Sequence, residues 1–512
     1  MKIPSFVAWL GGVALLGSCA ALCIPGLARA QTGRTPIPSI TGPLAVSASS
    51  YPFGRAWSLD LSQYGYVEEE YLVSGIANVY EWNAAGTAAQ VRTAGAPYTT
   101  RILVIRPSDR KAFTGKVMVD ILNMSNGWDF NKMWSVMHQH ILENGWTYVG
   151  VTSKPNAVAG LKAFDPERYR ALSWANPLPG SSPLNCAKVA EDSARETENG
   201  LAWDILSQVG ALLKEPSGRL PVKAERVYLA GFSQGGSFLY TYINAISPIA
   251  RLGSGKPVYD GFLIHAIDGN YATPINQCAP ELAAGDPRTF IMPVHEAPVI
   301  RINGGKDVLE QINSIRTRQP DSESPKGRFR LYEVPGGSHA WLYQTYYNVP
   351  CQDVAKAGFK NCTDTAPAAA ASLPGSLPGD LPTHYLLNGA LVNLDRWADQ
   401  GIAPPSAAPI EIDTTGAKPA FAYDANGNMK GGLRTPYVDV PIASYTADGS
   451  LWNWATKIPF SEDKLRSLYS TRKNYLDLVI ESTRMLVRDR WVTSRDAQRI
   501  IDEAAQARVP SR

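Results

Sequence analysis

The chain has 512 residues, which is enough to bury a large hydrophobic core. Hydrophobic residues make up 45% of it and charged residues 19%, which excludes an intrinsically disordered protein. The formal net charge is +3, or +1 without residues 1–30, which carry Lys2 and Arg29. This near balance gives no sign of a nucleic-acid or membrane-surface partner.

Residues 1–30 are predicted to be a signal peptide. Lys2 precedes an apolar run, Phe6 to Leu16, that is too short to span a bilayer, and Ala28-Arg29-Ala30 offers a small-residue cleavage site. The alternative is a lipoprotein signal, because Leu16-Gly17-Ser18-Cys19 resembles the box before a lipid-modified Cys19. Either signal predicts export to the periplasm or the cell exterior, and neither leaves a transmembrane segment.

Strand-like and helix-like segments alternate after a loosely ordered lead-in at residues 31–60. This alternation predicts an α/β fold with a mostly parallel central sheet flanked by helices. The predicted strands cover residues 66–75, 99–107, 116–123, 146–153, 226–231, 259–268, 297–304 and 328–334. The predicted helices cover residues 130–145, 196–215, 384–401 and 464–489.

Two long aperiodic segments, 154–188 and 270–296, interrupt a core predicted for residues 61–401. Loops of this length in a compact domain are usually functional, so we expect them to line a pocket. Three tryptophans are candidate pocket walls, although core packing is their commoner role: Trp128, Trp174 and Trp341.

A low-complexity stretch at 366–382 is predicted to be a surface linker. Residues 402–512 are predicted to form an α-rich C-terminal extension packed on the core, with a separate cap domain as the alternative.

Four cysteines lie beyond the predicted signal, and an oxidising compartment allows them three pairings. We expect Cys351 to pair with Cys362, which would close one short loop, and Cys186 to pair with Cys278. The spacings match no zinc pattern, so no metal site is expected.

The segment GFSQGG (231–236) is the strongest sign of chemistry in the chain. A G-x-S-x-G pattern alone is weak, but here an apolar strand leads into it and an apolar helix follows at once. Glycines two before and two after Ser233 let the strand and helix pass closely. This context predicts a nucleophile elbow that holds Ser233 in strained backbone.

A nucleophilic serine needs a base and an acid, which follow such an elbow in the order Asp or Glu, then His. His339 is the predicted base, because it lies in a Gly-rich loop directly after the last predicted strand. Asp307, after the penultimate strand, is the predicted acid, and Asp268 is the alternative. His138 and His140, on a helix before the serine, are expected to be packing or surface residues. The remaining histidines lie within a strand (His265), in the loop before the next strand (His295) and at the start of a helix (His384), so none of them has the place expected of the base.

Two backbone N–H groups are expected to bind the oxyanion of a tetrahedral intermediate. One belongs to Gln234, at the start of the helix after the serine. The other belongs to the loop 123–129, most plausibly to Met124, with Asn123 or Ser125 as alternatives.

These residues also carry a family resemblance. The chain resembles the α/β-hydrolase superfamily, and in particular a bacterial family described as "alpha/beta hydrolase domain". The matching segments, which span most of residues 60–505, lie at 65–82, 148–155, 164–169, 231–236, 318–322, 333–340, 396–405 and 426–441. The resemblance implies the α/β-hydrolase fold and a serine hydrolase that uses Ser233, Asp307 and His339. Many relatives have Ser-Glu-Thr-Asp where this chain has Gly304-Gly305-Lys306-Asp307, and an acidic residue in place of Trp341, so the pocket's polarity differs while the aspartate is kept.

We therefore expect an exported serine hydrolase that cleaves small-molecule carboxylic esters through an acyl-enzyme, without a metal or organic cofactor. An amidase or peptidase is the first alternative, because acyl transfer from esters and amides uses one constellation. A non-catalytic binding protein of the same fold is the second. Neither the substrate nor the oligomeric state follows from the sequence.

Overall fold

The structure, a computed structural model, describes most of the chain beyond the predicted signal. The described residues are 33–56, 58–186, 194–215, 220–267, 271–283, 285–309, 312, 318–340, 349–360, 362, 375–447 and 454–510. The predicted signal peptide, its Cys19, and the residues Asp268 and Trp341 lie outside these ranges, as does most of the predicted linker.

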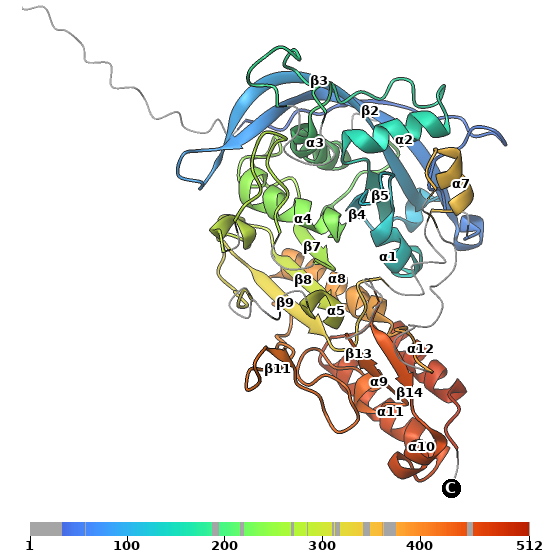
Figure 1. The fold of residues 1–512 in the computed structure, drawn as a ribbon. Coiled ribbons are helices and arrows are strands. Elements are labelled where there is room, and N and C mark those ends of the chain that lie inside the picture. The colour runs from blue at the N-terminus through green and yellow to red at the C-terminus, as the bar shows by residue number, and fades with distance from the viewer. Residues whose placement is uncertain are drawn as a thin grey trace, which may run out of the picture. The chain divides into compact units, whose positions relative to one another are not determined.

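In the described residues, a central sheet of nine strands runs in the order β1-β2-β3-β5-β4-β6-β7-β8-β9 (Figure 1). The pairings of β1 with β2, β2 with β3 and β3 with β5 are antiparallel, and all pairings from β5 to β9 are parallel. The strands are Ser39–Thr41 (β1), Tyr66–Trp82 (β2), Ala89–Pro107 (β3), Lys116–Ile121 (β4), Thr147–Val151 (β5), Arg226–Phe232 (β6), Gly261–His265 (β7), Val299–Gly304 (β8) and Phe329–Val334 (β9). The predicted mostly parallel sheet is confirmed.

Helices cover both faces of the sheet, because successive strand residues point to opposite sides. In β6, Val227 and Leu229 join one hydrophobic cluster and Tyr228 and Ala230 join another. The first cluster contains α2 (Pro155–Phe164), α3 (Ala202–Lys214) and α4 (Gln234–Thr241). The second contains α1 (Lys132–Glu143) and α8 (Thr383–Gln400). Each face is thus buried by its own set of helices.

The C-terminal segment shares the second cluster with α1 and α8. It contributes Tyr475, Val479 and Ile500, and the Asn388 amide of α8 donates a hydrogen bond to Asp496 at 3.1 Å. Its elements are β11 (Ile412–Asp413), β12 (Ala420–Phe421), α9 (Pro436–Asp439), β13 (Ala443–Thr446), β14 (Thr456–Pro459), α10 (Glu462–Leu468), α11 (Arg472–Arg488) and α12 (Ser494–Gln506). A small sheet in the order β10-β14-β13 joins it to β10 (Leu377–Pro378).

Two expectations about local structure were wrong. The predicted helix 464–489 is two helices, α10 and α11, because Thr471 begins a new helix by accepting a hydrogen bond from the Asn474 N–H at 3.0 Å. The aperiodic segment 154–188 contains a helix, α2. Its exposed face includes Ala159 and Ala163, so the contrast between apolar and polar positions that marks a surface helix is weak.

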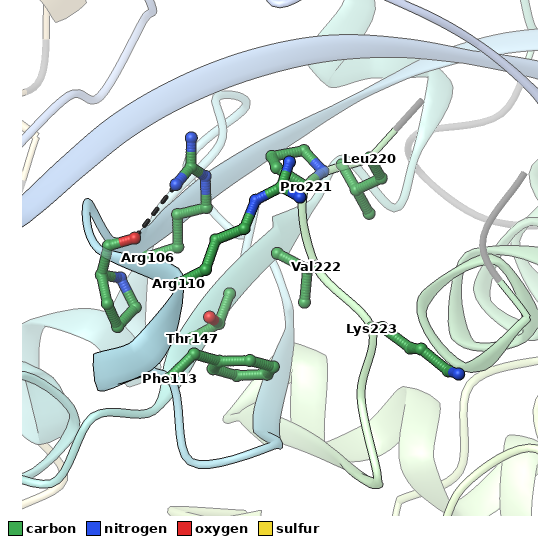
Figure 2. A pocket seen from close by; sticks show the side chains of 9 residues that line it. Arg106, Arg110, Phe113, Thr147, Leu220, Pro221, Val222 and Lys223 are labelled. Atoms are coloured by element: carbon green, nitrogen blue, oxygen red, sulfur yellow. Dashed lines mark hydrogen bonds between the residues drawn. The ribbon is translucent and has the colours of Figure 1, made fainter. Parts of the chain in front are cut away.

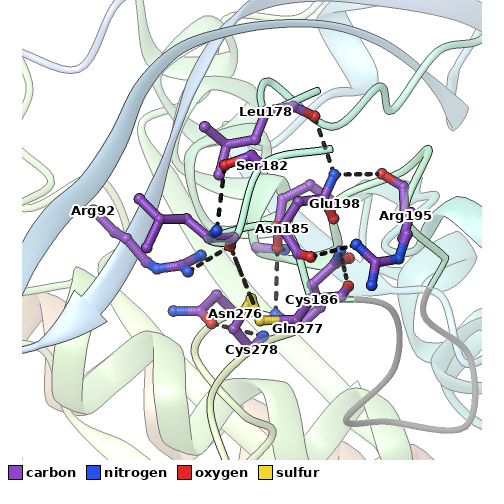
Figure 3. Close-up of a disulfide and its surroundings, with 12 residues drawn as sticks. Arg92, Leu178, Ser182, Asn185, Cys186, Arg195, Glu198, Asn276, Gln277 and Cys278 are labelled. Carbon is purple, nitrogen blue, oxygen red and sulfur yellow. Dashed lines mark hydrogen bonds between the residues drawn. A yellow bond between two sulfur atoms is a disulfide. The ribbon is translucent and has the colours of Figure 1, made fainter. Parts of the chain in front are cut away.

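Both expected disulfides are present in the structure. Cys186–Cys278 joins the segments predicted as two pocket walls, and the surrounding polar side chains bridge them further (Figure 3). Cys351–Cys362 closes a short loop that begins with α7 (Cys351–Lys356). Within the described residues, no helix combines the length and apolar character that crossing a bilayer requires.

Candidate active site

Ser233 lies in the turn between β6 and α4, at the carboxyl end of the parallel sheet. Its backbone has φ 53° and ψ −115°, a conformation that costs a non-glycine residue about 1–3 kcal/mol. The turn is held because the Ser233 N–H donates to the His265 carbonyl at 2.9 Å, and the Ser233 carbonyl accepts from the Ser237 N–H at 3.0 Å. The strained elbow predicted from the sequence is present.

The glycines beside the serine are required by close backbone contacts. A Cβ at Gly231 would lie 2.3 Å from the Gly235 carbonyl oxygen, and one at Gly235 would lie 2.6 Å from the Ile121 carbonyl oxygen. No side chain fits at these distances, so the strand and helix can meet at Ser233 only with glycine at both positions.

The predicted base and acid are in direct contact. His339 follows β9, and Asp307 lies in α5 (Gly305–Leu309) directly after β8. The His339 Nδ1 lies 2.6 Å from the Asp307 Oδ1, and the Gly304 N–H donates to the Asp307 Oδ2 at 2.7 Å. With Nδ1 directed at a carboxylate, the Nε2 of His339 is the nitrogen that can accept a proton.

Phe232 connects the serine strand to the histidine loop. Its ring meets the His339 ring edge-on with centroids 5.4 Å apart, and it meets His265 in the same way at 5.0 Å. Because Phe232 immediately precedes Ser233, the elbow lies beside the His339–Asp307 pair. The structure therefore brings Asp307 and His339 into contact and packs the residue before Ser233 against His339.

The loop after β4 lies against the elbow. The Asn123 amide donates to the Phe232 carbonyl at 3.0 Å, and the Met124 N–H donates to the Gln234 side-chain Oε1 at 3.1 Å. The N–H groups of the two alternatives are used within the loop, Asn123 toward the Phe130 carbonyl and Ser125 toward the Asn123 Oδ1. Met124 is thus the loop residue whose N–H faces the elbow.

The family described as "Alpha/beta hydrolase domain" matches residues 40–502, which is most of the chain. The chain belongs to this family. It is a hydrolase of the α/β fold, as the resemblance implied. Comparison with curated proteins found no match.

Several solved structures are similar to this hydrolase in fold. A CE15 glucuronoyl esterase from Teredinibacter turnerae is 12% identical, with 63% of this chain and 79% of the other covered and a TM-score of 0.27. Poly(aspartic acid) hydrolase-1 from Sphingomonas sp. KT-1 is 11% identical, with coverages of 54% and 96% and a TM-score of 0.28. The carboxylesterase Cest-2923 from Lactobacillus plantarum is 11% identical, with coverages of 50% and 82% and a TM-score of 0.26.

A buried ion-pair network anchors the far end of the loop after β4 in this hydrolase. The Asp129 Oδ2 accepts from the Thr152 hydroxyl at 2.5 Å and from the Arg101 Nε at 3.2 Å, and Arg101 also pairs with Glu70 at 2.8 Å. All of these charged side chains are fully buried, so removing one partner would leave an uncompensated charge. The loop is therefore fixed at Asp129 as well as at Asn123.

The five other histidines of the hydrolase are buried, as was allowed for His138 and His140 by the sequence interpretation. Burial lowers the pKa of His265 and His384 to about 3, and the pKa of His138, His140 and His295 to about 4. They are neutral at physiological pH and lie in the core, as do Trp128 and Trp174.

A cavity of about 320 Å³ lies at the amino ends of the parallel strands, the ends opposite to Ser233 (Figure 2). It is lined by residues near the amino end of β5, such as Thr147, and by Pro107 at the end of the antiparallel β3. It is therefore separate from the elbow. Among the described residues, no group of three His, Cys, Asp or Glu side chains could hold a metal ion.

The sequence did not indicate two polar contacts at the elbow. These are the Asn123 amide on the Phe232 carbonyl and the Gln234 side chain on the Met124 N–H. Both depend on β4 lying next to β6, a pairing between segments more than 100 residues apart that no local pattern encodes. The one available signal was the position of Asn123 at the end of a predicted strand.

Proposed function

We propose that this hydrolase cleaves carboxylic esters of small molecules through an acyl-enzyme formed on Ser233. The observation that carries the proposal is the contact between Asp307 and His339, made beside a serine in strained backbone. Strain of this kind persists only where the surrounding structure maintains it, and it clusters at reacting residues.

In this mechanism, the Ser233 hydroxyl attacks the ester carbonyl and transfers its proton to the His339 Nε2. Asp307 orients the imidazole and stabilises the imidazolium, which then protonates the departing alkoxide. Water repeats the sequence in the second half-reaction and releases the acid. These steps need only the side chains already named.

The oxyanion would be held by the backbone N–H groups of Gln234 and Met124. The first lies at the N-terminus of α4, where the helix dipole favours negative charge. The second donates to the Gln234 carboxamide, so that side chain must turn aside before Met124 can donate to a substrate.

Export is part of the proposal. Two disulfides are compatible with an oxidising compartment, where such bonds persist. The predicted signal at residues 1–30, with its alternative lipid attachment at Cys19, would be checked by N-terminal sequencing and mass measurement of the protein recovered from the producing cells.

The test is hydrolysis of 4-nitrophenyl butyrate by the wild type, by Ser233→Ala and by Ser207→Ala. Ser207 is a matched control, because it is a buried serine on α3 with hydrogen bonds to Trp203 and Tyr242. Ser233→Ala should lose activity on the order of 10⁶-fold, and Ser207→Ala should keep it. Turnover that survives in Ser233→Ala would mean that the elbow is only a turn.

The amidase alternative is tested by comparing the matched butyryl 4-nitroanilide. A kcat/KM for the anilide equal to that for the ester would move the assignment to amide bonds. A fluorophosphonate probe that fails to label folded wild type would favour a non-catalytic protein.

A further inference from the structure

A lysine beside the elbow has no counter-ion among the described residues. Lys132 is the first residue of α1, and its ammonium lies 4.4 Å from the centroid of the Phe130 ring and 5.9 Å from that of the Phe232 ring. Phe232 is the residue before Ser233, and its ring also contacts His339. The ammonium of Lys132 and the imidazole of His339 therefore contact one and the same ring.

This is an unfavourable place for a cation. A helix N-terminus carries positive partial charge, which repels an ammonium in the first turn. The side chain is partly buried, and desolvation lowers the pKa of Lys132 to about 8. The two rings offset part of this cost, because the face of an aromatic ring attracts a cation.

Two carboxylates on segments next to Lys132, those of Asp129 and Asp120, each hydrogen-bond to other groups through the Oδ2, while the Oδ1 of each has no hydrogen-bond partner among the described residues. Asp129 accepts from Arg101 and Thr152, and Asp120 accepts from the Tyr148 hydroxyl and the Met133 N–H. Across the described part of the chain, the Lys132 ammonium makes neither a hydrogen bond nor an ion pair.

The other buried cations near the site are partnered. Arg101 pairs with Glu70 and Asp129, and Arg168 pairs with Glu70. Arg101 and Arg168 thus have carboxylate partners, whereas Lys132 has none among the described residues. A charged group that is kept unpaired in partly desolvated surroundings is ready to receive an anion from solution.

We propose that Lys132 binds a carboxylate on the substrate and makes the enzyme selective for esters that also carry a free carboxylate. The inference rests on the proposed function and names its substrate class. The buried rings of Phe130 and Phe232 fix the position of the Lys132 ammonium beside the residue that precedes Ser233. Lys132 acts on substrate binding, so its effect falls mainly on KM.

The test compares two pairs of esters whose members have the second carboxyl group either free or methylated. Mono-4-nitrophenyl adipate and its methyl ester place the carboxylate on the acyl side, and 4-acetoxybenzoate and its methyl ester place it on the leaving group. Wild type should favour the acid over its methyl ester in at least one pair by about tenfold or more in kcat/KM. A tenfold ratio corresponds to 1.4 kcal/mol, which lies within the range for a charge-assisted hydrogen bond.

Lys132→Met should bring that ratio to about one, and Lys132→Arg should keep most of it. Lys116→Met is the matched control, because Lys116 is also half-buried over an aromatic ring, that of Trp146, but lies at the amino end of β4. It should leave the ratio unchanged.

The outcomes separate this inference from the proposed function. Ser233-dependent turnover with no charge preference in either pair, or with a preference that Lys132→Met leaves intact, overturns the inference alone. Absence of any Ser233-dependent turnover overturns both.

Discussion

Replacing Ser338 by Ala tests how the C-terminal part of the chain supports the base. Ser338 is the residue before His339, and its buried hydroxyl accepts from the Ala455 N–H at 2.9 Å and donates to the Gly379 carbonyl at 3.3 Å. The substitution removes both bonds and leaves a buried N–H of Ala455 unpaired, which costs about 1–3 kcal/mol. Urea denaturation should show a loss of this size in the free energy of unfolding.

The same substitution should also lower kcat for 4-nitrophenyl butyrate by about 10- to 100-fold, because a small displacement of a catalytic group costs that much. KM should change little, since Ser338 does not face a substrate group in the proposed mechanism. Burst kinetics would show whether acylation or deacylation is slowed.

Ser207→Ala is again the control, because its hydroxyl also makes two buried hydrogen bonds, at 2.8 and 2.9 Å, on the remote helix α3. It should lose similar stability and keep kcat. If both variants lose stability equally and both keep kcat, the contacts to Ala455 and Gly379 do not position His339, and the reasoning fails.

The remaining predictions concern the site and its supports. Asp307→Asn should lower kcat by about 10³- to 10⁴-fold with little change in KM, measured by steady-state ester hydrolysis. An effect smaller than tenfold would mean that another residue acts as the acid of the triad. Gln234→Ala should raise kcat/KM by about 2- to 10-fold, because the Met124 N–H is released from one hydrogen bond, and a tenfold fall would contradict this. Cys278→Ser removes the disulfide to Cys186, which closes 92 residues, and should destabilise the fold by about 4–5 kcal/mol. Cys362→Ser removes the disulfide to Cys351, which closes 11 residues, and should cost about 3 kcal/mol. Thermal unfolding measures both losses, and equal losses would contradict the chain-entropy account. The five buried histidines have folded-state pKa values below the ordinary value, so the unfolded chain binds protons first as pH falls below about 6.5. Buried carboxyls with raised pKa values, those of Glu68 and Asp120, act in the opposite direction and stabilise the fold as the pH falls. After this opposing effect, the free energy of unfolding should still fall by a few kcal/mol from pH 7 to pH 5, and a flat profile would contradict the prediction.

The elbow could be predicted from the sequence because its causes are local. The strand, the glycines and the helix around Ser233 follow one another within about 17 residues, and together they are typical of a sharp turn from strand to helix. Asp307 and His339 were predictable for a related reason, because each follows a clear strand and parallel strands deliver their carboxyl ends to one edge of a sheet.

Contacts between distant segments could not be predicted in this way. Helix α2 was missed because its exposed face includes the alanines Ala159 and Ala163, which weakens the apolar period that marks a surface helix. The break before Arg472 was missed although Thr471 is a good N-cap residue, because apolar periodicity continues on both sides of it. The unpaired state of Lys132 depends on where every nearby carboxylate points, which only the folded chain determines.

The hydrogen bonds that hold the histidine loop have a consequence for the order of events during synthesis. Ser338 receives its backbone donor from Ala455, 117 residues later in the chain, and the Leu433 N–H donates to the Glu333 carbonyl at 2.7 Å. A nascent chain that has produced the serine, the aspartate and the histidine still lacks these partners. In the proposed mechanism these contacts hold the loop of the base, so full activity is expected only after the last quarter of the chain has been made, and a cell that exports the chain during translation would carry little active hydrolase on the inner side of the membrane.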